Sequence, residues 1–135
     1  MAKKVSFSIK PYVVKKLITC YKDQSINDAC SLMAKNDIGT IIIIERKNKK
    51  KCLGIFTESD LVKKVISKKI SLDEILEKVM SKKIVTANMD SSDAFVSYLM
   101  TKNKVKKLII LKDSKLCGII TQSDMMKLLS QEWLK

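Results

Sequence analysis

The residues best suited to chemistry form a polar motif, Thr-x-Ser-Asp, which occurs twice, at Thr57–Asp60 and at Thr121–Asp124. Each copy follows an apolar run and precedes an amphipathic one, which predicts a buried strand that leads into a helix. At a helix N-terminus, free backbone N–H groups and the helix dipole favour an anion, and hydroxyl and carboxylate groups can bind a sugar or a phosphate. The same residue types also cap helices without binding a ligand. Repetition in register favours binding, and the simple cap stays open as the alternative.

The composition argues against catalysis and against a metal site. The chain has no histidine, and its three glycines are scattered, so the commonest general base and a glycine-rich phosphate loop are both missing. The cysteines form no Cys-x-x-Cys pair, which argues against zinc. We therefore predict no enzyme activity, no metal and no required cofactor.

The four cysteines, Cys20, Cys30, Cys52 and Cys117, instead predict free thiols in a reducing cytoplasm. No long apolar segment follows the basic start of the sequence, so we expect no secretory signal. No apolar run approaches the roughly 20 residues that span a bilayer, so we expect no membrane association either.

The net charge of +13 comes from 27 basic and 14 acidic residues, and only one basic residue, Arg46, is an arginine. Such a charge attracts polyanions without selecting a sequence. Arginine for base contacts is scarce, and aromatic residues make up only 5% of the chain, so few side chains could stack on bases. Electrostatic binding of nucleic acid is therefore an alternative function.

The sequence contains an internal repeat. A displacement of 67 positions pairs Ile41–Ile44 with Leu108–Leu111, and further along a displacement of 64 pairs Gly54 with Gly118. The difference of three residues falls in the polar stretch between two predicted strands, where a hairpin loop tolerates it. The chain is therefore predicted to consist of two fused halves with the same fold.

Each half has the same order of predicted elements: an extended piece, a helix, two strands and a closing helix. With 46% hydrophobic residues the chain can build a core, although one copy alone would cover a sheet face poorly. The predicted fold class is α/β, with mixed sheets and flanking helices, as two β-α-β-β-α repeats packed as a pseudo-two-fold pair. The extended pieces are 17–19 and 84–86, the first helices 25–35 and 92–103, and the strands 41–44, 52–56, 108–111 and 116–120.

The helical spacing of apolar residues predicts which helix faces are buried. In the first helices these residues are Ile26, Ala29, Cys30 and Met33, and Phe95, Val96, Leu99 and Met100. In the closing helices they are Leu61, Val62, Val65 and Ile66, and Met125, Met126, Leu129 and Trp133.

The repeat also sets the predicted domain boundaries. Ser71–Glu74 has the capping-box pattern, which predicts a short linker helix through Val79. Pro11–Lys16, before the first half, matches Lys78–Lys83 in position. The predicted ranges are an N-terminal lead-in at 1–16, a first repeat at 17–70, a linker helix and lead-in at 71–83, and a second repeat at 84–135.

In their order, spacing and duplication, these motifs resemble a tandem pair of cystathionine-β-synthase (CBS) domains, or Bateman module, over residues 9–131. The family often has a proline within the second strand, where this sequence has Ile42 and Ile109. In the first half the matching residues are Ile18–Thr19, Asp23, Ser25, Met33–Thr40 and Leu53–Leu61, and in the second half Val85–Thr86, Asp90, Met100–Val105 and Gly118–Asp124.

The resemblance implies a stand-alone regulatory sensor and not a catalyst. Such a module would bind an adenosine-containing ligand, namely AMP, ADP, ATP or S-adenosylmethionine, in clefts between the repeats, and would signal to an effector protein. The resemblance also implies a homodimer that forms a flat disc of four repeats. A ligand-free dimerisation or scaffold module is the alternative.

The resemblance further assigns roles by position. Asp60 and Asp124 would hold ribose hydroxyls, the Thr and Ser of each motif would meet phosphate, and Thr19 and Thr86 would border the base. Lys106 and Lys107 lie where phosphate-binding members are often basic, which favours the second motif. The ligand-binding residues predicted in this way are Thr19, Ile38, Gly39, Thr40, Thr57, Ser59, Asp60, Val85, Thr86, Val105, Lys106, Lys107, Thr121, Ser123 and Asp124.

Overall fold

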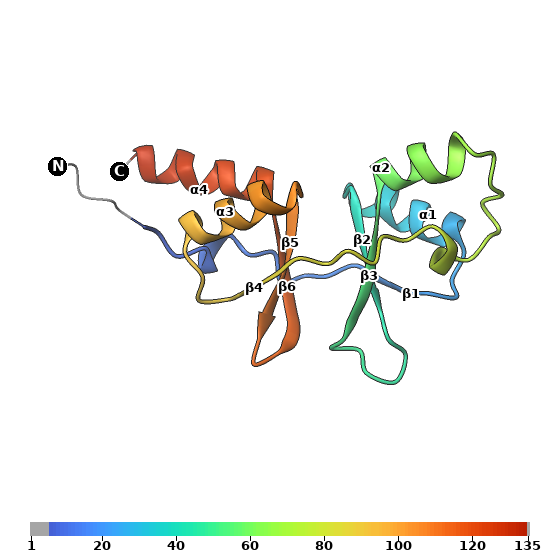
Figure 1. Ribbon diagram of the computed structural model, residues 1–135, viewed down its shortest axis with the longest axis horizontal. Helices are drawn as coiled ribbons and strands as arrows, with labels where there is room; N and C mark the ends of the chain where they lie inside the picture. Colours follow the sequence, from blue (N-terminus) through green and yellow to red (C-terminus); the bar gives the residue numbers. More distant parts are fainter. Residues whose placement is uncertain (1–5, 135) are drawn as a thin grey trace. The chain divides into compact units, whose positions relative to one another are not determined.

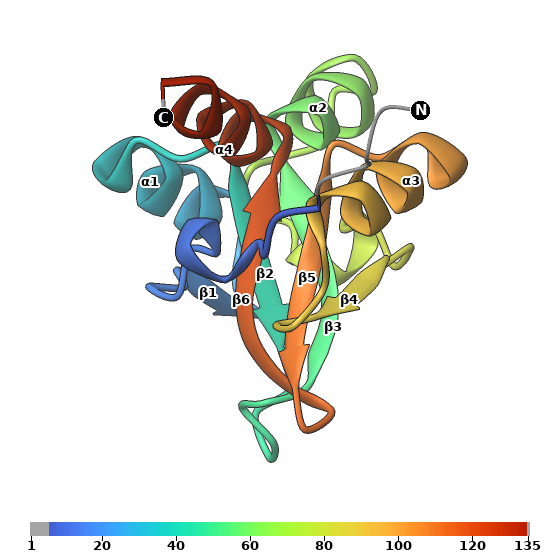
Figure 2. The same ribbon diagram turned by 90° about the vertical axis from the view of Figure 1, so that its left-hand side faces the viewer.

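The computed structural model describes residues 6–134. Residues 1–5 of the predicted lead-in and residue 135 of the predicted second repeat lie outside the described residues. The described chain divides into two compact units: a first-repeat unit, Ile18–Ile84, and a second-repeat unit formed by residues 6–17 with residues 85–134. Each unit holds a three-stranded mixed sheet with flanking helices (Figures 1 and 2), which confirms the predicted mixed α/β class.

In the first-repeat unit the sheet order is β1-β2-β3, with β1 parallel and β3 antiparallel to the central strand β2. Strand β2 is apolar after its first residue, Thr40, and Ile41 and Ile43 pack with Ile26 of α1 and Phe56 of β3 in one core. The elements are β1 (Thr19–Tyr21), α1 (Ile26–Asn36), β2 (Thr40–Ile44), β3 (Cys52–Thr57), α2 (Glu58–Asp60), the π-helix η2 (Leu61–Ile66) and the 3-10 helix η3 (Leu76–Lys78).

The second-repeat unit repeats this arrangement, with sheet order β4-β5-β6 and the same strand directions. Its core joins Leu108 and Ile110 of β5 to Val96 of α3, Ile120 of β6 and Leu128 of α4. The elements are the 3-10 helix η1 (Lys10–Tyr12), β4 (Thr86–Asn88), α3 (Asp93–Asn103), β5 (Lys107–Lys112), β6 (Lys115–Thr121) and α4 (Gln122–Leu134).

The predicted apolar faces of α1 and α3 are only partly confirmed. Both helices begin at a serine cap, where the side chain of Ser25 accepts from the Asp28 N–H and that of Ser92 from the Phe95 N–H. Cys30 and Leu99 are half-buried, and Phe95 was wrongly predicted to be buried: it is 48% exposed. The physical reason is that Phe95 stacks on Tyr98, which is also exposed, and not on the sheet. The residues that are buried as predicted are Ile26, Ala29, Met33, Val96 and Met100.

The predicted apolar faces of the closing helices are too wide. In each closing helix only a narrow apolar stripe is buried, formed by Val65 in η2 and by Met125 and Leu128 in α4. Leu61 is half-buried, and Leu128, which was not predicted, is fully buried. The stripe next to it in each unit is apolar and exposed, which corrects the prediction for Val62, Ile66, Met126, Leu129 and Trp133.

Two glycines mark where a further chain segment pairs with the last strand of each sheet. Ile55 and Ser81 exchange backbone hydrogen bonds of 3.0 and 2.8 Å, and a Cβ atom on Gly54 would lie 2.6 Å from the Ser81 carbonyl oxygen. Val14 pairs with Ile119 in the same way in the second-repeat unit. The predicted match in position between the lead-in and the end of the linker is therefore confirmed.

The predicted linker helix is wrong: only Leu76–Lys78 forms a single 3-10 turn. Several backbone groups of the linker bond to the start of the first repeat, where the N–H groups of Ile26 and Asn27 donate to the carbonyls of Glu74 and Leu72. Further along, the Leu76 N–H donates to the Gln24 carbonyl. These tertiary bonds replace the internal bonds that a helix would need.

Candidate functional site

The first polar corner, Thr57–Asp60, lies where β3 ends and α2 begins, as predicted. The Thr57 N–H donates to Oδ2 of Asp60 at 3.0 Å, and the Asp60 N–H donates to Oγ1 of Thr57 at 3.1 Å. This reciprocal pair is a capping box. Asp60 is only 8% exposed, and the bond from the Thr57 N–H holds its carboxylate in place.

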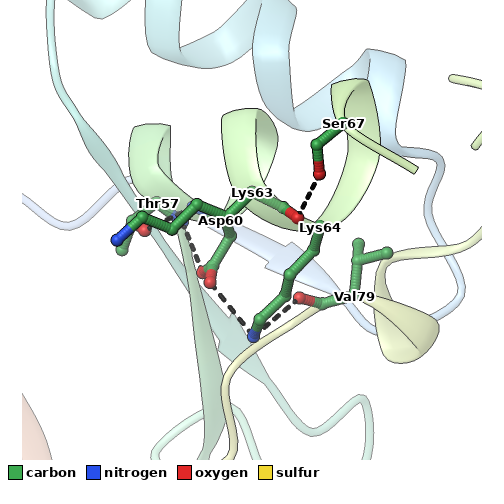
Figure 3. Close-up of polar contacts among 6 residues, drawn as sticks. All are labelled: Thr57, Asp60, Lys63, Lys64, Ser67 and Val79. Atoms are coloured by element: carbon green, nitrogen blue, oxygen red, sulfur yellow. Dashed lines mark hydrogen bonds and ion pairs between the residues drawn. The ribbon is translucent and has the colours of Figure 1, made fainter. Parts of the chain in front are cut away.

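The other oxygen of Asp60 is also occupied. Nζ of Lys64 lies 3.1 Å from Oδ1 of Asp60 and donates to the Val79 carbonyl oxygen at 3.4 Å. Figure 3 shows the lysine side chain reaching between these two acceptors. Both oxygens of the Asp60 carboxylate therefore have partners within the first-repeat unit.

The second corner, Thr121–Asp124, lies where β6 ends and α4 begins. Oδ2 of Asp124 accepts from the Thr121 N–H at 2.8 Å and from the Thr121 hydroxyl at 2.9 Å, and Asp124 is also 8% exposed. Within the part of the chain that the structure describes, Oδ1 of Asp124 has no hydrogen-bond or ion-pair partner. Every fully buried side-chain polar atom among those residues has a partner. Oδ1 of Asp124 has none among them, so it is not fully buried and is accessible to solvent or to a ligand.

Among the described residues, Oδ1 has a partner in Asp60 but not in Asp124, and the residue four positions after each aspartate accounts for this difference. It is Lys64 in the first corner and Leu128, fully buried in the core, in the second. The buried residue of the π-helix η2 is Val65, five positions after Asp60, in keeping with the i to i+5 hydrogen bonds of a π-helix, which are one residue longer than those of an α-helix. Lys64 is thereby left beside the carboxylate, outside the core. Lys64 was not among the predicted site residues, although its pairing with a leucine in the repeat was a signal that could have identified it.

Some predicted site residues are brought to the corners. Thr40 lies opposite Thr57 in the sheet, and the Glu58 N–H donates to the Gly39 carbonyl at 3.1 Å. The second corner has the same arrangement, with Lys107 opposite Thr121 and the Gln122 N–H bonded to the Lys106 carbonyl at 2.8 Å. Gly39 and Thr40 thus adjoin the first corner, and Lys106 and Lys107 adjoin the second.

The remaining predicted residues are more distant from the corners or point to solvent. Thr19 pairs with Ile42 and Thr86 with Ile109, so both lie two strands away from the strand that carries the corner. Ser59 and Ser123 are exposed on the first turn of their helices. Ile38, Val85 and Val105 are half-buried, and their backbone bonds run to the helices or the central strands. A role for these residues in binding remains a prediction.

A cavity of about 310 Å³ in the first-repeat unit lies away from the corner. Tyr21 and Ile44, the last residues of β1 and β2, form part of its wall, at the opposite end of the strands from Thr40. Arg46 stacks 4.2 Å from the centre of the Tyr21 ring and forms two hydrogen bonds with Asp23. Arg46 and Asp23 of the cavity wall are thus engaged with each other, and the cavity contains none of the predicted site residues.

The cysteines are free thiols, as predicted, with Cys20 buried and the other three half-buried. Burial raises the pKa of Cys20 and of Cys52 to about 11, so both stay protonated at neutral pH. Among the described residues, no group of three His, Cys, Asp or Glu side chains could hold a metal ion, and no helix is long and apolar enough to cross a membrane.

Comparison with known proteins identifies the family. Residues 9–67 and 72–131 each match the CBS domain. The chain belongs to the CBS domain family. It holds two such domains, which confirms the tandem pair, and the CBS domain pair is a regulatory module that is generally non-catalytic.

The curated relatives of this CBS pair are longer proteins. An uncharacterised protein of Methanocaldococcus jannaschii is 28% identical over 117 residues, which cover 86% of this chain and 63% of the relative. The chain spans between 56% and 63% of the length of three such relatives.

Solved structures share the fold. An uncharacterised conserved protein from Pyrococcus horikoshii has a TM-score of 0.83 at 30% identity, covering 90% of this chain and 91% of that one. A CBS domain pair described in complex with 5′-methylthioadenosine and S-adenosylmethionine has a TM-score of 0.83 at 23% identity, covering 95% and 99%. A CBS domain protein from Pyrobaculum aerophilum, described as complexed with AMP, has a TM-score of 0.81 at 14% identity, covering 93% and 99%. The last two show the fold alone, and the ligands belong to those proteins.

Proposed function

We propose that this CBS pair is a regulatory module that binds an adenosine-containing ligand and passes the signal to a partner protein. The observation that carries the proposal is the Asp124 carboxylate. It is nearly buried and held in place by Thr121, and its Oδ1 is left without a partner among the described residues. A fixed carboxylate oxygen of this kind is a suitable acceptor for a ribose hydroxyl.

The surroundings of Asp124 support a negatively charged ligand. Lys106 and Lys107, both basic, adjoin the corner through the pairing of β5 with β6. The ligands named for two proteins of the same fold, AMP and S-adenosylmethionine, both contain adenosine. The adenosine class is therefore proposed for this chain, with Asp124 as the ribose-binding residue.

Calorimetric titration of the whole chain with AMP, ADP, ATP and S-adenosylmethionine tests this proposal. We expect one of them to bind and the Asp124→Asn variant to lose at least about tenfold in affinity, since a neutral amide is a weaker acceptor. Asp113→Asn is the matched control, because Asp113 is exposed in the same unit and outside the corner. If no ligand releases heat, or if Asp124→Asn binds as the native chain does, the proposal is wrong.

As part of this proposal, the chain forms a homodimer of four repeats, and the homodimer signals to the partner protein. The exposed apolar stripes support this: Val62 and Ile66 in one unit, and Met126, Leu129 and Trp133 in the other, are more than half exposed. Apolar stripes of this kind are typical of protein interfaces. The four free thiols support a cytoplasmic setting as part of the same proposal.

Light scattering tests the dimer. The native chain should have twice the monomer mass, and Leu129→Lys should shift it towards the monomer, whereas Ser130→Lys, on an exposed polar neighbour, should not. A monodisperse native monomer, with and without ligand, would contradict the dimer. A dimer that binds no adenosine compound would instead support the ligand-free scaffold.

A further inference from the structure

The ion pair of Lys64 with Asp60 distinguishes the two corners. We propose that Lys64 closes the first corner, so that the protein takes its adenosine-class ligand at Asp124 and binds a second one at Asp60 only weakly. This inference rests on the proposed function, because it concerns which of the two matched carboxylates is available to the ligand.

The contacts of the carboxylate support closure. Oδ2 of Asp60 accepts from the Thr57 N–H and Oδ1 faces the Lys64 ammonium at 3.1 Å. A ribose hydroxyl that donates to Asp60 must therefore displace a charge-assisted bond, which is stronger than a bond between neutral groups. At Asp124 the equivalent oxygen has no partner among the described residues, so no such displacement is needed.

The position of the ammonium is well defined. Nζ of Lys64 also donates to the Val79 carbonyl, so two of its three N–H donors are directed at groups of the first-repeat unit (Figure 3). Val79 itself is buried and belongs to the linker, which hydrogen-bonds to the first repeat. The amine is thus held between two fixed acceptors.

The π-helix supplies the geometry that places the lysine there. In η2 the buried position falls on Val65, so Lys64 is released from the core, where its twin Leu128 is buried in α4. A regular α-helix after Asp60 would direct position 64 into the core, where an ammonium without a partner is unfavourable. The lysine and the π-helical turn are therefore matched to each other.

Lys64 could in principle serve a ligand phosphate instead, and the two roles predict opposite results. If Lys64 closes the corner, replacing it frees Asp60 and strengthens binding there. If Lys64 holds phosphate, replacing it weakens binding. The observed contacts favour closure, because the ammonium is already engaged by a carboxylate and a carbonyl.

The experiment measures binding at the first corner alone, in the whole chain carrying Asp124→Asn. AMP and S-adenosylmethionine are titrated calorimetrically into this variant, and then into the variant that also carries Lys64→Met, which keeps the aliphatic stem and removes the charge. We expect the added Lys64→Met to tighten binding at least about tenfold, the scale of one charge-assisted hydrogen bond. Adding Asp60→Asn should abolish the gain.

Lys63→Met is the matched control, because Lys63 is the exposed neighbour and its ammonium forms no hydrogen bond or ion pair with Asp60 (Figure 3). Lys64→Gln, also neutral, repeats the test if Lys64→Met does not fold, as judged by circular dichroism. Unchanged or weaker binding after either Lys64 substitution overturns the closure while the proposed function stands. If the native chain and every variant release no heat, the proposed function and the closure are both overturned.

Discussion

The two polar corners have the same motif and the same cap, yet they differ in what reaches the carboxylate. Thr57 and Thr121 hold Asp60 and Asp124 in nearly the same way, and both aspartates are 8% exposed. Lys64 then bonds to Asp60, whereas its twin Leu128 is buried in the core. The comparison teaches that the motif fixes the position of the carboxylate, while the next helical turn decides whether it is available.

Substitutions at the equivalent positions 64 and 128 should differ most in their effect on the free energy of unfolding. Leu128→Ala should cost about 2–5 kcal/mol in the free energy of unfolding, because it leaves a cavity in the core of the second-repeat unit. Lys64→Ala should cost less than about 1 kcal/mol, since the lysine is partly exposed and Asp124 is already stable with one oxygen unpaired. Urea denaturation measures both, and equal losses would contradict the assigned burial.

The glycines should behave alike in the two repeats. Gly54→Ala and Gly118→Ala should each cost about 1–3 kcal/mol, because the new Cβ atom would lie 2.6 Å from the Ser81 carbonyl oxygen or 2.8 Å from that of Val14. Gly39→Ala is the control, because its Cβ would meet only the flexible end of Glu58, at 3.3 Å. Urea denaturation that finds no difference between Gly39→Ala and the other two would show that the segments do not pair as described.

Removing the two threonine caps should lower the free energy of unfolding by slightly different amounts. Thr57→Val and Thr121→Val should each cost about 1 kcal/mol of unfolding free energy through loss of the N-cap. Thr121→Val should cost somewhat more, since the Thr121 hydroxyl also donates to Oδ2 of Asp124 at 2.9 Å. Thr→Ser at either position keeps the hydroxyl and should retain most of the stability in the same denaturation experiment. A larger loss for Thr57→Val would reverse the comparison.

The smallest expected effect concerns the ion pair of Asp23 with Arg46 in the first repeat. The second repeat has Asp113 in the position of Arg46 and so lacks an equivalent pair. The hydrogen bonds and charge of Arg46 lower the pKa of Asp23. The lowered pKa means that this pair adds stability at neutral pH, which is lost as the pH falls through that pKa. A carboxyl NMR titration should show the pKa of Asp23 rising in Arg46→Ala and unchanged in Lys47→Ala. An unchanged value in Arg46→Ala would rule out the pair in solution.

The repeated elements were predictable because the chain contains two copies. The strand pairs and the corners recur in register, and β2 is apolar enough to be identified as a buried central strand. The capping role of Thr57 and Thr121 follows from their place before an amphipathic run, as the structure confirms. Local patterns of this kind depend on neighbouring residues, which the sequence displays directly.

The features that the sequence did not predict depend on tertiary contacts. The linker is not a helix because Ile26 and Asn27 take its carbonyl groups. The apolar spacing in Leu61–Ile66 fits an α-helix and predicts Val65 and Ile66 alike to be buried, whereas in the π-helix only Val65 is. In η2 the buried position lies five residues after the aspartate and not four, which leaves Lys64 beside Asp60. The apolar spacing alone could not predict this ion pair.

A crystal structure of the native chain with whichever adenosine compound binds in the titration tests the central claim most directly. We predict the ribose on the Asp124 carboxylate, with the Lys64 ammonium still bonded to Asp60. A ribose on Asp60, with Lys64 displaced and Asp124 without ligand, would contradict the account.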